Sequence, residues 1–227
     1  MPLPKVSKEQ RFTYQRRGRF FLSAPIGEQP YVVFALHGYG QHPRYFLRPF
    51  EQLGRADILF VAPEGLHRFY VNHEKKRVGS SWMTAEDRET DMADYLQMLQ
   101  QVRQKVLSQF ATPPQQVGLL GFSQGVATAC RWATYGPQNF DHLVNWAGAF
   151  PPDLDFGEAH RRLQHLPLHW VLGQEDPYLP PERVAEQEAV LKENAIRYQV
   201  HHYAGDHRIH APTLQRLYEE LWPASSA

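Results

Sequence analysis

Short apolar runs alternate along the chain with longer stretches in which apolar residues recur every three or four positions. The short runs are typical of strands buried on both faces, and the longer stretches are typical of amphipathic helices. The predicted buried strands are residues 31–36, 58–62, 117–120, 143–146, 168–172 and 198–203. The predicted helices are residues 43–53, 84–110, 126–135, 158–163, 181–193 and 212–221. This alternation predicts a mainly parallel α/β sheet with helices on both faces.

Other segments have weaker patterns. Residues 12–14 and 19–22 are predicted as two antiparallel edge strands joined by a hairpin turn near Arg17 and Gly18. Residues 66–82 show no clear period and are predicted as a long surface loop, a kind of segment that is often functional. Thr84, with Asp87 three residues later, is the expected N-terminal cap of the long helix.

Length and composition narrow the class of protein. A chain of 227 residues is expected to form one domain, residues 1–227, whose first 30 residues supply the antiparallel edge strands. Its 24 basic and 24 acidic residues balance, so nothing predicts a nucleic acid or an anionic membrane as partner. No signal-peptide region or membrane span is recognisable, and the single cysteine fits a reducing compartment. We expect a cytoplasmic monomer or homodimer.

The strongest chemical signal is the stretch from Val117 to Gly125. Its apolar run ends in Gly121-Phe122-Ser123-Gln124-Gly125, a G-x-S-x-G pattern between a predicted strand and a predicted helix. That context predicts a strained turn that lifts the Ser123 hydroxyl above the sheet. It also places the Gln124 N–H at a helix N-terminus, where it can receive negative charge. The alternative is that Ser123 is an ordinary helix cap.

Further polar residues follow the ends of other predicted strands. His37–Gly40, Asp176 and His207 each come just after a strand, and the carboxyl ends of parallel strands meet at one edge of a sheet. We therefore expect them near Ser123. A serine becomes nucleophilic when an imidazole takes its proton, and a carboxylate holds that imidazole in one tautomer. Serine, aspartate and histidine occur here in the chain order of α/β-hydrolases.

Neighbouring residues compete for two of these roles. Glu175 could replace Asp176, although adjacent positions point in different directions. His210 could replace His207, although it falls near the start of the last predicted helix instead of on the exit loop.

The run from residue 201 to residue 210 contains four histidines. His201 and His202 are neighbours on a predicted strand, so their side chains point to opposite faces and cannot share a metal ion. Only His207 and His210 remain as a possible pair, and we expect neither a metal nor a cofactor. His37 is expected to brace the glycine turn by hydrogen bonding instead of acting as a base.

At these positions the chain resembles the phospholipase/carboxylesterase family of small α/β-hydrolases, relatives of acyl-protein thioesterases. The resemblance runs from about residue 31 to the C-terminus, and it rests on LHGYG, GFSQG, GQEDPYLP and YAGDH. It implies an α/β-hydrolase fold without a separate cap domain. It also implies that Ser123 is the nucleophile, Asp176 the orienting acid and His207 the base. The backbone N–H groups of Tyr39 and Gln124 would form the oxyanion hole.

These observations predict a serine hydrolase that cleaves small carboxylic esters through an acyl-enzyme, with thioesters and lysophospholipids as further substrates. A peptidase or amide hydrolase on the same fold is one alternative, and a hydrolase-like protein that binds without turnover is another. Trp82, Trp146 and Phe150 are candidate walls of an acyl pocket, with core packing as their alternative role. The irregular stretches 66–82 and 151–166 are too short for a cap domain. The resulting open cleft favours short to medium acyl chains.

Overall fold

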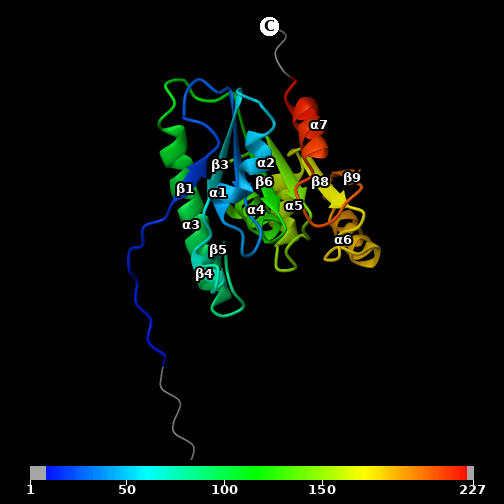
Figure 1. Ribbon diagram of the computed structural model, residues 1–227. Helices are drawn as coiled ribbons and strands as arrows, with labels where there is room; N and C mark the ends of the chain where they lie inside the picture. The colour runs from blue at the N-terminus through cyan, green and yellow to red at the C-terminus, as the bar shows by residue number, and fades with distance from the viewer. Residues whose placement is uncertain (1–8, 224–227) are drawn as a thin grey trace, which may run out of the picture.

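A seven-stranded sheet forms the centre of the computed structural model, which describes residues 9–223 (Figure 1). Its strand order is β1-β3-β2-β6-β7-β8-β9, and all neighbouring strands are parallel except β1, which runs antiparallel to β3. This confirms the predicted α/β fold. The strands are β1 (Phe20–Leu22), β2 (Tyr31–Leu36), β3 (Ile58–Pro63), β6 (Gln116–Phe122), β7 (His142–Trp146), β8 (Leu168–Gly173) and β9 (Gln199–Tyr203).

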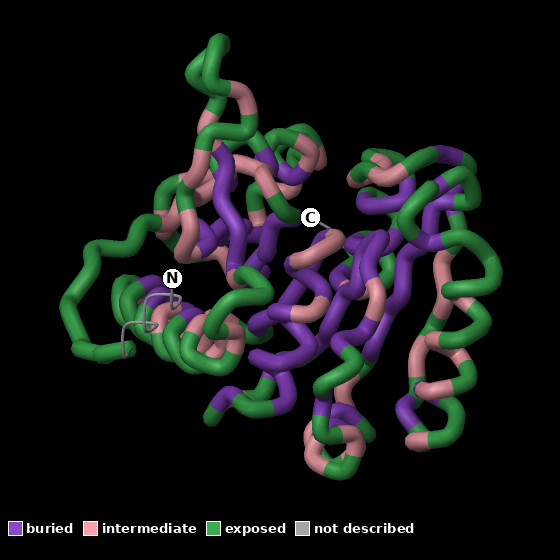
Figure 2. Tube along the Cα trace, turned by 90° about the horizontal axis from the view of Figure 1, so that it is seen from below, coloured by how far each residue is buried: buried purple, intermediate pink, exposed green. Residues whose placement is uncertain are grey.

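Helices cover both faces of this sheet. One face packs against α3, α4, α5 and α6, and the other packs against α1, α2 and α7. Figure 2 shows the consequence, with buried strands in the middle and exposed segments outside. The helices are α1 (Pro43–Phe46), α2 (Arg48–Glu51), α3 (Arg88–Leu107), α4 (Gln124–Tyr135), α5 (Phe156–Leu163), α6 (Pro181–Glu193) and α7 (Ala211–Leu221).

The apolar runs are buried on both sides because alternate residues of a strand point to opposite faces. In β2, Val32 and Phe34 belong to the core under α3 and α4, whereas Val33 and Ala35 belong to the core under α1, α2 and α7. Cys130 of α4 is buried in the first of these cores, as a small hydrophobe would be, and burial raises the pKa of its thiol to about 12.

The N-terminal hairpin prediction is wrong in part. Within the described residues, 12–14 form no strand, and Phe12 and Tyr14 are exposed. The second predicted strand exists as β1, but it pairs with β3 instead. An isolated two-stranded hairpin without a buried face is at best marginally stable, whereas the edge of β3 offers an existing partner. Residues 1–8 and 224–227 of the predicted domain lie outside the described residues.

The helix predicted at 43–53 is divided into α1 and α2 at Leu47. Pro49 explains the division, because it lacks the N–H that a continuous helix would need at that position. The long helix α3 begins at Arg88 with Asp87 as its N-cap residue, so the predicted cap at Thr84 is wrong. The Thr84 N–H instead donates to Asp91 Oδ2 at 3.0 Å.

The surface loop predicted at 66–82 is an antiparallel hairpin of β4 (His67–Asn72) and β5 (Arg77–Ser81). No residue of β4 is fully buried, and its apolar stretch is only Phe69, Tyr70 and Val71 between polar residues, so it lacks the longer buried run that marked the other strands. The hairpin projects from the sheet in Figure 1.

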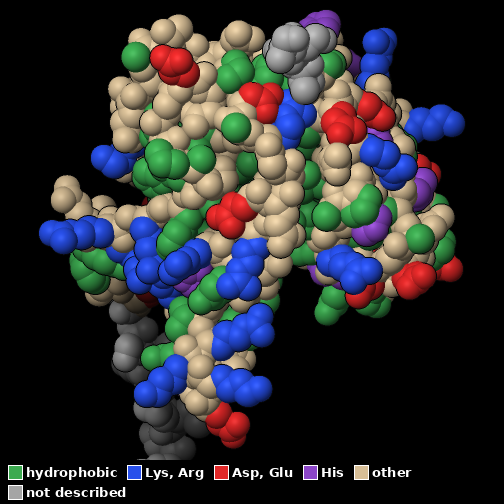
Figure 3. All heavy atoms as spheres, turned by 45° about the horizontal axis from the view of Figure 1, so that its top comes forward, with side chains coloured by type: hydrophobic (Ala, Val, Ile, Leu, Met, Phe, Trp, Pro, Cys, Tyr) green, Lys and Arg blue, Asp and Glu red, His purple; other side chains and the backbone are tan. Residues whose placement is uncertain are grey.

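The surface carries charges of both signs, and Figure 3 shows basic and acidic side chains together on one face. Across the part of the chain that is described, no helix is both long enough and apolar enough to cross a membrane.

Candidate active site

Ser123 occupies the turn between β6 and α4 with φ 54° and ψ −118°. Such backbone conformations cost a non-glycine residue on the order of 1–3 kcal/mol and occur mainly where function requires them. Two glycines make the turn possible: a Cβ on Gly121 would lie 2.4 Å from the Gly125 carbonyl oxygen, and a Cβ on Gly125 would lie 2.1 Å from that of Leu36. Ser123 stands at the N-cap position of α4, but its side chain makes no capping hydrogen bond, so it does not act as an ordinary helix cap.

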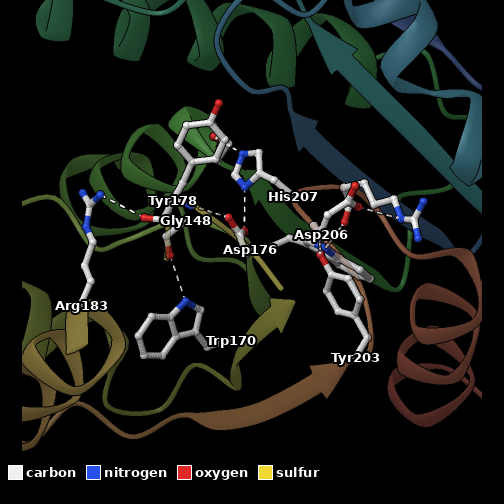
Figure 4. A network of polar contacts seen from close by, with 11 residues as sticks. Gly148, Trp170, Asp176, Tyr178, Arg183, Tyr203, Asp206 and His207 are labelled. Carbon is white, nitrogen blue, oxygen red and sulfur yellow. Dashed lines mark hydrogen bonds and ion pairs between the residues drawn. The ribbon is translucent and has the colours of Figure 1, made fainter. Parts of the chain in front are cut away.

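The structure brings Ser123, His207 and Asp176 into one hydrogen-bonded line. His207 Nε2 lies 2.9 Å from Ser123 Oγ. His207 Nδ1 lies 2.7 Å from Asp176 Oδ2, a contact shown in Figure 4. The Asp176 side chain is fully buried, and its other oxygen accepts the Tyr178 N–H at 2.9 Å. The carboxylate is thus fixed in place and aims one oxygen at the imidazole.

The loop after β9 holds His207 in position. The Tyr203 hydroxyl lies 2.7 Å from the Asp206 carbonyl oxygen and 2.8 Å from that of Arg208. The His207 ring packs between Phe122 and Tyr178, with ring centroids 5.0 Å and 4.7 Å away. These contacts restrict both the backbone and the ring of His207.

The competing residues lie elsewhere. Glu175 is exposed, and the structure describes no side-chain hydrogen bond for it. His210 stacks on Tyr203 and has its Nδ1 2.9 Å from Thr213 Oγ1 at the start of α7. His201 Nε2 contacts His169 Nδ1 at 3.0 Å. Within residues 9–223, no group of three or more histidine, cysteine or acidic side chains is arranged to hold a metal ion.

The glycine turn after β2 packs directly against the serine. A Cβ on Gly38 would lie 3.1 Å from Ser123 Cβ. The Gly38 N–H donates to Gln41 Oε1 at 2.8 Å, and the Gly40 N–H donates to the Ser80 carbonyl at 2.9 Å. The N–H groups of Tyr39 and Gln124 donate to no other described residue. They are therefore free to receive an oxyanion.

Buried side chains support this turn from below. His37 has its Nδ1 2.7 Å from the Gly38 carbonyl oxygen and accepts the Gly65 N–H on Nε2 at 3.1 Å. Burial lowers the pKa of His37 to about 4, so the ring is neutral and donates through Nδ1. Trp82 stacks on His37 and donates its indole N–H to the His37 carbonyl at 2.8 Å. His37 thus braces the turn as expected.

A cleft of about 740 Å³ opens above Ser123. Phe150 lines it, as predicted, whereas Trp82 and Trp146 do not. Both tryptophans are fully buried, and Trp146 donates its indole N–H to the Arg208 carbonyl at 2.9 Å. Their candidate role as pocket walls is therefore wrong. Large aromatic side chains at strand ends turn inward because burying them removes much apolar surface from water.

The sequence analysis missed several residues of the cleft. Ala127 and Thr128 line one wall, one turn beyond Ser123 on α4, and helical spacing could have identified them. Arg88, Arg131 and Arg183 also line the cleft, and no sequence signal distinguished them from ordinary surface residues. The further lining residues include Met83, Gly148, Tyr178 and Leu179.

Comparisons with known proteins identify the family of the chain. The phospholipase/carboxylesterase family model matches residues 19–222. None of the curated proteins compared with the sequence matches it. Several solved structures share the fold of this chain at low sequence identity.

Acyl-protein thioesterase 2 from Zea mays is 22% identical with a TM-score of 0.68, covering 90% of this chain and 98% of its own. A phospholipase/carboxylesterase from Dyadobacter fermentans is 19% identical with a TM-score of 0.64, covering 92% and 97%. A carboxylesterase from Mesorhizobium loti is 14% identical with a TM-score of 0.67, covering 86% and 89%. These similarities establish an α/β-hydrolase fold.

Proposed function

The chain belongs to the phospholipase/carboxylesterase family and is a hydrolase of the esterase or thioesterase type, and from this we propose that it cleaves small carboxylic esters with Ser123 as nucleophile. One observation carries the proposal: the hydrogen-bonded line from Ser123 Oγ through His207 to Asp176, with distances of 2.9 and 2.7 Å. That line is what a serine hydroxyl needs to lose its proton as it attacks.

The chemistry follows from this arrangement. The Ser123 oxygen attacks the ester carbonyl while its proton passes to His207 Nε2. Asp176 stabilises the resulting imidazolium through Nδ1. The carbonyl oxygen becomes an oxyanion, which the N–H groups of Tyr39 and Gln124 receive. The intermediate then collapses: its bond to the alcohol oxygen breaks, His207 gives its proton to that oxygen, and the acyl group stays on Ser123. Water, deprotonated by His207, releases the acid and restores the serine.

The walls of the cleft favour short to medium acyl chains. Near Ser123 they are small and apolar, with Ala127, Ala147 and Gly148 among them. Each methylene contributes up to about 0.8 kcal/mol while it is buried there. Specificity should therefore rise over the first few carbons. The thioesterase and phospholipase names of the structural relatives extend the proposal to thioesters and lysophospholipids.

Replacing the nucleophile is the direct test. Ser123→Ala should lower kcat for 4-nitrophenyl butyrate by on the order of a millionfold, because the members of such a triad act as a unit. His207→Ala should cost nearly as much, while His210→Ala, its matched control, should cost little. Thermal unfolding of each variant monitors the fold. Retained turnover in purified Ser123→Ala would contradict the mechanism.

Two further measurements separate the alternative functions. Covalent labelling of Ser123 by a fluorophosphonate is expected of an esterase and not of a protein that only binds its ligand. A matched ester and amide with the same acyl group separates an esterase from an amide hydrolase, and we expect turnover of the ester alone.

A further inference from the structure

The cleft above Ser123 has a local excess of positive charge. Arg88, Arg131 and Arg183 line it, and no acidic residue of the described chain does. The protein as a whole carries equal numbers of basic and acidic residues. The arginines in the cleft are therefore a local feature and not part of a generally basic surface.

Two of these arginines lie at one end of the cleft. Ser123, Ala127, Thr128 and Arg131 follow the spacing of one helix face on α4, and all four line the cleft. At 1.5 Å per residue, Arg131 lies about 12 Å along the helix axis from Ser123. The cleft thus runs from the serine past small side chains to a guanidinium, and we call this arginine-lined part the distal end.

A single carboxylate is shared at the distal end. Arg131 Nη2 and Arg88 Nη2 lie 2.6 Å and 2.5 Å from the same oxygen of Asp153. Desolvation raises the pKa of Asp153, but the hydrogen bonds and charges of Arg131 and Arg88 outweigh it and lower that pKa. Asp153 is therefore ionised and offsets one of the two positive charges. One net positive charge remains.

The two guanidinium groups differ in freedom. The Arg131 side chain is buried and also bonds Nη1 to the Tyr95 hydroxyl at 3.3 Å, so it is fixed. The Arg88 side chain is 38% exposed, and Asp153 is its one partner in the described chain. Arg88 therefore has N–H groups available to a ligand. Arg183, the third arginine of the cleft, donates to the Tyr178 carbonyl at 3.1 Å, as Figure 4 shows.

We propose that Arg88, positioned by Asp153 and Arg131, binds a carboxylate of the substrate, so that the preferred esters carry a carboxylate remote from the bond that is cleaved. A guanidinium offers two parallel N–H donors that match the two oxygens of a carboxylate. Asp153 alone would need only one arginine to balance it, and the second arginine leaves the charge that a substrate carboxylate would neutralise. This inference rests on the proposed function and names its substrate class.

A pair of esters of equal length tests the proposal. The mono-4-nitrophenyl ester of suberic acid carries a terminal carboxylate that 4-nitrophenyl octanoate lacks. We expect kcat/KM to be at least about tenfold higher for the suberate, the gain typical of one charged hydrogen-bonded contact. A second pair, 3-acetoxybenzoate and phenyl acetate, places the carboxylate on the alcohol side. The pair with the larger ratio identifies which half of the ester reaches Arg88.

Variants assign the effect to the residue. Arg88→Met should lower the favoured ratio about tenfold, and Arg88→Lys should retain part of it because the charge remains. Arg161→Met is the matched control, since Arg161 lies on α5 outside the cleft and its loss changes the net charge equally. It should leave the ratio unchanged.

The outcomes separate this inference from the proposed function. If the kcat/KM ratio is near one for both pairs while the wild-type protein still turns over 4-nitrophenyl octanoate and phenyl acetate, the carboxylate subsite is overturned. The proposed esterase function then still stands. A high ratio that survives Arg88→Met would also overturn it. Absence of turnover for every ester would instead contradict the proposed function.

Discussion

Single hydrogen bonds position the groups that surround the serine. Gln41 is an example, because its side-chain oxygen accepts the Gly38 N–H at 2.8 Å and so closes the turn that carries the Tyr39 N–H. Gln41 touches no reacting atom in the proposed mechanism. It is a positioning residue, and its loss should affect the oxyanion more than the bound ester.

Gln41→Ala should lower kcat for 4-nitrophenyl butyrate about tenfold with little change in KM, because about 1.4 kcal/mol of transition-state stabilisation is lost. Gln29 supplies a matched control: its Oε1 also accepts a glycine N–H at 2.8 Å, from Gly27, but away from the cleft. Gln29→Ala should leave kcat unchanged. An increase in KM alone for Gln41→Ala would contradict the positioning role.

The sequence could predict the positions of those site residues that lie in a turn directly after a predicted strand. The structure brings Ser123, Asp176 and His207 together because each follows a strand of one parallel sheet, and that order is legible in the chain. Arg131 was not recognisable, because an arginine on a helix ordinarily faces solvent. Its burial depends on Asp153, which comes from a distant loop. Pairings of that kind arise only in the folded molecule.

At the scale of elements, the hairpin of β4 and β5 supports the glycine turn. Ser80 of β5 forms a bridge with Gln41, and the Gly40 N–H donates to the Ser80 carbonyl. Gly79 lies against the same turn, where an added Cβ would come 1.9 Å from the Gly40 carbonyl oxygen. The backbone of the hairpin therefore contacts the glycine turn and restricts its position.

Gly79→Ala should displace the turn, because neither backbone can yield without moving the other. We expect a loss of roughly 1–3 kcal/mol in the free energy of unfolding, the usual range for overpacking, together with reduced kcat. Chemical denaturation and kinetics measure the two effects. Gly27→Ala, whose Cβ would have ordinary contacts, is the control and should change neither. An unaltered kcat in Gly79→Ala would show that the hairpin does not position the turn.

The hairpin was missed, whereas the strands of the large sheet were recognised from their apolar runs. Both faces of β2 and β3 are covered, so nearly every residue in them is apolar. The residues of β4 are half-buried or exposed. Its pairing with β5 depends on backbone hydrogen bonds, which any residue type except proline can form and which the sequence therefore does not reveal. Pro49 could have predicted the division of α1 from α2, but the apolar residues continue at helical spacing across that position and favoured one helix.

The whole molecule holds several neutral histidines in its interior. Burial lowers the pKa of His37 to about 4, that of His142 to about 3 and that of His169 to about 4. In the unfolded chain these rings gain protons near pH 6.5. The unfolded state therefore binds more protons below that pH, and stability must fall as the pH drops.

We expect the free energy of unfolding to decline between pH 6.5 and pH 5, before most carboxylates titrate. Each histidine contributes up to about 1.4 kcal/mol per pH unit. Urea denaturation at a series of pH values measures the slope. His142→Leu removes one such group and should flatten the slope, while His73→Leu, at an exposed position, should not. A stability that is constant over this range would contradict the prediction.

The strand order also places the two ends of the proposed triad in different parts of the sheet. From β6 outward the sheet adds β7, β8 and β9 in the order of the chain, and β9 forms its outer edge. Ser123 follows the first of these strands and His207 the last, 84 residues later. Edge elements fray at a lower cost than central ones. Because the proposed mechanism needs both residues, fraying of β9 at the edge should abolish turnover while the centre of the sheet is still folded.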